Sequence, residues 1–224
     1  MTITDYTYVA TTGFNCMPTH QLGRAARRFA LQPARFHGPF DWFMLTVDHV
    51  VTALESDFRN FFRPETVRIT GKLDEDHWRV NDRTGVKSWH HFCRKSEDEN
   101  ITAHAWSRFD RWFNRRLKLW RTALADPNGR VLIVRVQSAA VTDTVEDLTR
   151  LAEVLRARAC GEISIAALTL ADLHVSHPDV RTYPLKRTWP ENVDVDQMNW
   201  DRDYGLGPAW QGHDASWDEF WNRV

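Results

Sequence analysis

Cys16 is the residue of this 224-residue chain whose type and position best suit covalent chemistry. It follows a β-branched and aromatic run at residues 6–10 and precedes a segment with helical periodicity that ends near Phe29. A thiol at a helix N-terminus lies at the positive end of the helix dipole, where the first N–H groups have no helical partner. These effects lower the thiol pKa and favour thiolate. The sequence therefore predicts a reactive Cys16, and the alternative is a small buried residue that begins the helix.

The same helix end offers an oxyanion site. The backbone N–H at Cys16 is expected to donate to a developing oxyanion, with help from the side chain of Asn15, which is also a candidate N-cap. Cys16 and Asn15 are therefore the predicted oxyanion residues.

His90 and His91 are the candidate bases, within a predicted strand at residues 86–92. Adjacent side chains on a strand point to opposite faces, so one histidine can face a cleft while the other packs or meets solvent. A neutral imidazole beside a thiol forms a Cys–His pair, and the alternative is two partly exposed strand histidines. Cys93 completes a His-x-x-Cys spacing, but a metal site would need ligands from the scattered His77, His104 and His174. We therefore expect no metal.

Asp41 follows a Gly38-Pro39 turn and has two interpretations. It can orient a catalytic histidine, as the third member of a triad does. It can equally begin a helix over residues 41–62 as the N-cap.

The remaining elements define the fold class. An aromatic stripe and many arginines predict an amphipathic helix at 105–125. Apolar strands at 131–136 and 163–170 flank a helix at 143–159, with Asp143 as its N-cap. This strand–helix–strand unit implies parallel pairing and an α/β or α+β class with a mixed sheet and packed helices. We expect one domain over residues 1–224, with an irregular Trp- and Pro-rich tail from about residue 172 that includes a short helix at 216–222.

Composition excludes several classes of protein. The net charge of −1 provides no field to attract nucleic acid or anionic lipid, so the basic helix at 105–121 is interpreted as a solvated face. No apolar run approaches the roughly 20 residues of a membrane span, and the polar residues 1–10 do not resemble a secretory signal. Three cysteines predict a reducing, cytoplasmic location. No Walker, GxSxG or HExxH motif occurs, and no cofactor is predicted.

Several segments, taken in order, resemble a bacterial domain family of unknown function whose members are described as papain-like cysteine peptidases. They are Gly13-Phe14-Asn15-Cys16, Gly38-Pro39-Phe40-Asp41-Trp42, an aromatic helix ending in Phe61-Phe62, His90-His91-Phe92, a basic helix at 111–121 and the strand at 131–136. The resemblance spans roughly residues 8–170, and its Pro-Phe-Asp-Trp element is the most specific part.

This resemblance implies a papain-like fold with Cys16 as nucleophile and His90 as its partner, with His91 as the alternative. Papain-like sites place an Asn or Asp after the histidine, whereas Asp41 precedes it in this chain. Asp172, at the end of an apolar strand, has the expected order but no matching motif.

The residues and the resemblance agree on Cys16 at a helix N-terminus paired with a histidine of a later strand, and the resemblance alone selects His90 over His91. The predicted function is a papain-like peptidase or hydrolase that acts on a peptide, amide or acyl substrate, and an acyltransferase would use the same dyad. A hypothesis of a different class is a non-catalytic binding module with a groove lined by some of the eleven Trp residues. Binding of nucleic acid through the basic helix is a third hypothesis, which the neutral net charge disfavours.

Overall fold

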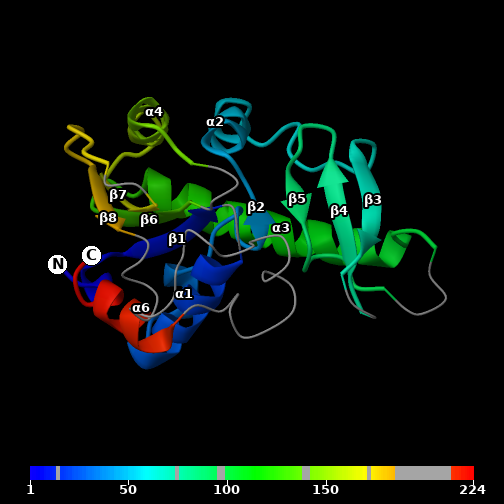
Figure 1. Ribbon diagram of the computed structural model, residues 1–224, viewed down its shortest axis with the longest axis horizontal. Helices are drawn as coiled ribbons and strands as arrows, with labels where there is room; N and C mark the ends of the chain where they lie inside the picture. Colours follow the sequence, from blue (N-terminus) through cyan, green and yellow to red (C-terminus); the bar gives the residue numbers. More distant parts are fainter. Residues whose placement is uncertain (14–15, 74–75, 95–98, 138–141, 171–172, 185–212) are drawn as a thin grey trace.

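The computed structural model describes residues 1–13, 16–73, 76–94, 99–137, 142–170, 173–184 and 213–224. Within these residues the chain forms five α-helices, a parallel sheet and an antiparallel sheet (Figure 1). The expected mixed α/β class is confirmed, and the arrangement is consistent with a papain-like α+β fold.

The parallel sheet has the strand order β1-β6-β7-β8, and every neighbouring pair is parallel. Its strands are β1 (Tyr8–Gly13), β6 (Arg130–Val136), β7 (Glu162–Thr169) and β8 (Val180–Pro184). Helix α4 (Val145–Arg156) crosses from β6 to β7. Both predicted apolar strands and their parallel pairing are confirmed, because strands covered by helices on both faces form continuous apolar runs.

Two hydrophobic cores lie on the two faces of this sheet. Side chains alternate along each strand, so Val131 and Ile133 enter one core while Leu132 and Val134 enter the other. Three helices, α2 (Val47–Glu55), α3 (Ala103–Ala125) and α4, contribute to the first core. Two helices, α1 (Met17–Arg28) and α6 (Asp214–Trp221), contribute to the second, and Figure 1 shows α1 together with α6 on the side of the sheet away from α4.

The antiparallel sheet has the order β2-β5-β4-β3. Its strands are β2 (Phe43–Met44), β3 (Val67–Lys72), β4 (Trp78–Asp82) and β5 (Lys87–Ser88). The sheet meets the parallel sheet directly after β2, where the Leu45 N–H donates to the Gly13 carbonyl at 2.8 Å. The carboxyl end of β1 is therefore fixed to the second sheet.

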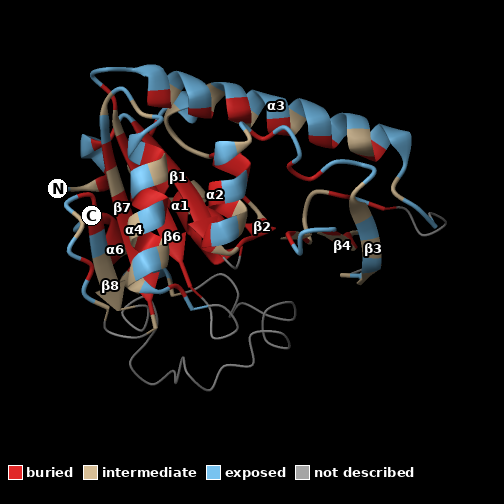
Figure 2. Cartoon of the chain, turned by 90° about the horizontal axis from the view of Figure 1, so that it is seen from above, coloured by how far each residue is buried: buried red, intermediate tan, exposed pale blue. Residues whose placement is uncertain are grey.

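Helix α3 spans both sheets. Its 23 residues extend about 35 Å at 1.5 Å per residue, and Figure 2 shows it along one edge of the whole molecule. Trp120 near its end contacts Tyr8 of β1, with ring centroids 6.3 Å apart. Phe109 near its start contacts Phe92 beyond β5 at 5.2 Å. One apolar stripe thus joins the two sheets into a continuous core.

Three local predictions are wrong. Residues 41–62 do not form one helix, because Trp42 has a left-handed φ of 66° and α2 begins only after Thr46, whose side chain accepts from the His49 N–H. Helix α4 has Thr144 rather than Asp143 as its N-cap. The strand predicted at 86–92 ends at Ser88, so His90 and His91 lie in a bend.

The predicted terminal helix is confirmed as α6, whose Trp217, Phe220 and Trp221 are buried. Residues 185–212 of the predicted tail lie outside the described residues. Among the helices that the structure describes, none has the length and hydropathy that crossing a bilayer requires.

Candidate active site

Cys16 lies between the carboxyl end of β1 and the first turn of α1. It is the N-cap residue of α1 with nearly helical φ and ψ of −84° and −13°, and its carbonyl accepts from the His20 N–H at 3.1 Å. The predicted position at a helix N-terminus is therefore correct. Only 1% of the residue surface is exposed, and its side chain makes no capping hydrogen bond.

The ionisation of Cys16 differs from the prediction. We expected the helix end to lower the thiol pKa, but burial raises it well above the ordinary value. The reason is that a thiolate shielded from water loses its hydration energy, and this loss exceeds the attraction of a helix dipole. In this arrangement Cys16 is a neutral thiol at physiological pH.

His90 lies at the wall of an open pocket of about 650 Å³ between the bend after β5 and helix α3. Its ring contacts the Trp42 ring with centroids 5.2 Å apart and the His77 ring at 6.2 Å. The pocket is lined by Trp42, His90, His91, Cys93, Arg108, Phe109, Arg111 and Trp112.

His91 lies deeper in the same wall, among aromatic rings. The ring centroids of Phe43 and Trp112 are each 4.4 Å from its own, and its Nδ1 is 2.6 Å from the Ser88 hydroxyl. Burial, with the nearby charge of His90, lowers the pKa of His91 to about 3. His91 is therefore neutral at pH 7, held in place by Ser88.

Trp42 links Cys16 and His90 indirectly, through a hydrogen bond to the helix that begins at Cys16 and a ring contact with His90. The backbone N–H of Trp42 donates at 3.3 Å to the hydroxyl of Thr19, in the first turn of the helix that begins at Cys16, while the Trp42 ring contacts His90. No hydrogen bond within the described chain joins Cys16 directly to His90 or His91. Thr19 and Trp42 thus link the start of α1 to His90 without a direct hydrogen bond between the predicted pair.

Asp41 is fully buried, and its carboxylate is bound to residues other than the two predicted histidines, while its backbone carbonyl acts on His91 and partly offsets the lowering of that pKa. Its carboxylate accepts from the Thr11 hydroxyl at 2.9 Å and from the Gly38 N–H at 3.1 Å, and it lies 2.9 Å from Nδ1 of His37. The helix-capping interpretation is wrong, because these bonds close the turn at residues 38–41 instead. The histidine that Asp41 orients is His37.

His37 lies beside α1 at Gly23, too far from the start of the helix to act on Cys16. Its Cε1 lies 4.0 Å from the position that a Cβ would take on Gly23, seven residues after Cys16. Seven residues of helix correspond to about 10 Å. The Asp41–His37 pair is therefore a partly buried structural contact within the turn at residues 37–41.

His20 was not predicted and is the histidine nearest to Cys16 in sequence. It lies one helical turn after Cys16, a spacing that places two Cβ atoms about 5–6 Å apart on one face. Burial lowers its pKa, so it is neutral at pH 7. The Cys-x-x-x-His spacing alone could have identified it as a second candidate base.

A buried ion pair fixes the strand ends around Cys16. Arg135 of β6 makes two hydrogen bonds to Asp143, at 2.8 and 2.7 Å, and donates to the Leu45 carbonyl at 2.8 Å. Both side chains are almost completely buried. Because Leu45 in turn binds Gly13, the pair holds the chain three residues before Cys16.

Two predicted residues, Asn15 and Asp172, lie outside the described residues. In the part of the chain that is described, no group of three or more His, Cys, Asp or Glu side chains is placed to hold a metal ion.

Comparisons with known proteins give one match. No curated protein and no solved structure matches the chain. The sequence profile of a family of unknown function, described as "putative papain-like cysteine peptidase", matches residues 7–170. This range includes Cys16, Asp41 and His90 and covers most of the chain, so the protein belongs to that papain-like family.

Proposed function

We propose that the protein is a thiol-dependent hydrolase of an amide or peptide bond, with Cys16 as nucleophile and His90 as general base. The observation that carries this proposal is the position of Cys16 between a buried parallel strand and a helix N-terminus, in a chain of the papain-like family. The pocket beside His90, which Trp42 also lines, would receive the substrate.

The proposed reaction has two steps. The Cys16 sulfur bonds to the substrate carbonyl carbon while His90 takes the thiol proton, and the proton then passes to the leaving amine as the C–N bond breaks. Water, deprotonated by His90, then cleaves the thioester. An amine that replaces this water would make the protein an acyltransferase. N–H groups at the start of α1 would stabilise the oxyanion.

The burial of Cys16 sets a condition on this reaction. A neutral thiol that is 1% exposed neither ionises nor meets a substrate, so the proposal requires the surroundings of Cys16 to open before attack. We therefore expect substrate or partner binding to precede ionisation of the thiol.

The test is hydrolysis of a library of fluorogenic coumarin peptide amides by the wild type and by Cys16→Ala, His90→Ala and His20→Ala. We expect loss of activity in Cys16→Ala, at least a 100-fold decrease in His90→Ala and nearly full activity in His20→Ala. Cys160→Ala is the matched control, because Cys160 is an exposed thiol that does not line the His90 pocket, and it should retain activity. Full activity in Cys16→Ala would refute the proposal. A large loss in His20→Ala with normal His90→Ala activity would reassign the base.

A non-catalytic binding module is the second candidate, and the neutral, buried Cys16 favours it. In that case no amide in the library is hydrolysed. Iodoacetamide then alkylates Cys16 slowly at every pH below 9, with no effect of His90→Ala or His20→Ala.

A further inference from the structure

The pocket beside His90 has a chemical character that the proposed hydrolysis does not explain. One wall is apolar and aromatic, formed by Trp42, Phe109 and Trp112. Trp112 is fixed there, because the Arg116 guanidinium lies 5.7 Å from its ring centroid and the His91 ring lies at 4.4 Å. A rigid aromatic wall in an open pocket suits a flat apolar group.

Two arginines give the pocket a positive charge. Arg108 and Arg111 are three residues apart on α3, both are exposed, and both line the pocket. No acidic side chain lines the pocket within the described residues, and neither arginine forms an ion pair there. Two unneutralised guanidinium groups beside an aromatic wall are a recognition site for a planar anion.

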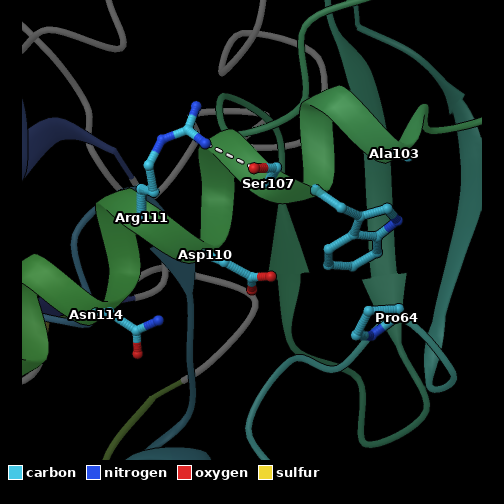
Figure 3. Close-up of a pocket in the computed structure, with 7 residues that line it drawn as sticks. Pro64, Ala103, Ser107, Asp110, Arg111 and Asn114 are labelled. Atoms are coloured by element: carbon cyan, nitrogen blue, oxygen red, sulfur yellow. Dashed lines mark hydrogen bonds between the residues drawn. The ribbon is translucent and has the colours of Figure 1, made fainter.

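The orientation of Arg111 supports this charge assignment. Its guanidinium donates to the Ser107 hydroxyl at 2.6 Å, and Figure 3 shows it turned toward Ser107 and away from Asp110. Asp110 lines a second hollow on α3, to which Arg111 also contributes, together with Pro64 and Trp106. The hydroxyl of Ser107, and not the carboxylate of Asp110, therefore holds the guanidinium of Arg111.

We propose that this pocket binds a carboxylate attached to an aromatic group, with the ring against Trp42 and Trp112 and the carboxylate on Arg108 and Arg111. A free aryl-alkanoic acid and the C-terminal aromatic residue of a peptide share this chemistry. Binding of this ligand does not require Cys16 to be catalytic, so the binding proposal is tested independently of the proposed hydrolysis.

Matched acids and amides test the site. The probes are 3-phenylpropanoate and N-acetylglycylphenylalanine, each compared with its neutral amide, and binding is followed by tryptophan fluorescence and calorimetry. We expect each acid to bind at least tenfold more tightly than its amide, and 0.5 M salt to weaken only the acids. Tighter binding of the dipeptide acid would identify a peptide C-terminus as the ligand, and tighter binding of 3-phenylpropanoate would identify a free acid.

Arginine variants locate the charge. Arg108→Met and Arg111→Met should each reduce affinity for the acids about tenfold, and the double variant should bind acid and amide equally. Arg115→Met is the matched control, because Arg115 is exposed on the same helix and does not line the pocket. Cys16→Ala should bind the acids as the wild type does, which separates this result from catalysis. Equal binding of acid and amide to the wild type, or a preference that survives in the double variant, would overturn the proposal.

Discussion

Cys16 and the pocket beside His90 are linked through Trp42, yet they present opposite environments. Cys16 is closed to solvent, and burial raises its pKa. The pocket is open, contains the exposed Cys93, and has two arginines that no described acid neutralises. The comparison teaches that position at a helix N-terminus does not decide the charge of a thiol. Desolvation decides it, because the free-energy cost of removing water from a thiolate exceeds the stabilisation that one helix dipole provides.

Loss of the buried Arg135–Asp143 ion pair should have the largest effect on the strand ends around Cys16. Asp143→Ala leaves the Arg135 guanidinium buried without its partner carboxylate, so we expect the free energy of unfolding to fall by about 3–5 kcal/mol in urea titrations. Arg150→Ala is the control, because the Arg150–Asp48 pair is exposed, and its loss should be less than about 1 kcal/mol. A loss as small as that of the control would show that Arg135 and Asp143 do not stabilise the strand ends.

On the pocket side, His91 makes stability depend on acid pH. Its folded pKa of about 3 lies below the ordinary value of 6.5, so the unfolded chain binds more protons between these values. The contribution of His91 to the free energy of unfolding is complete above pH 6.5 and is lost as pH falls toward 3. The slope of this free energy against pH approaches about 1.4 kcal/mol per pH unit.

His91→Phe tests this assignment, because a phenyl ring suits the aromatic surroundings and does not titrate. We expect the variant to lose most of that slope in unfolding measurements between pH 6.5 and 4. His104→Gln, at an exposed position of α3, should retain it. An unchanged slope in His91→Phe would mean that another group is responsible.

The sequence predicts the parallel sheet better than the site, for physical reasons. Apolar runs such as residues 131–136 are sufficient for a strand that is buried on both faces, and they fix the parallel pairing. Asp41 was misassigned because a carboxylate that caps a helix and one that binds Thr11 and Gly38 have the same sequence signature. The pocket depends on three segments that are distant in the chain, and no local pattern predicts their contact.

Stability at alkaline pH distinguishes the buried thiol of Cys16 from the exposed thiol of Cys93. The raised pKa of Cys16 means that the folded chain keeps a proton that the unfolded chain releases above its ordinary thiol pKa of roughly 8.5. Its contribution to stability is therefore complete below that pH and is lost as pH rises. Between pH 9 and 10 the wild type should lose about 1 kcal/mol through this residue.

Cys16→Ala should lower stability at both pH values by creating a cavity, but it should abolish this particular decrease. Cys93→Ala, which removes the exposed thiol, should retain the decrease. Urea unfolding of the three proteins at pH 9 and 10 measures the difference, and the cavity term cancels between the two pH values. The buried Tyr8, whose pKa is also raised, contributes equally to all three proteins. An equal decrease in the wild type and in Cys16→Ala would therefore mean that Cys16 ionises in the folded chain as it does in the unfolded chain. The helix end would then outweigh burial, and the thiol would need no opening before it attacks.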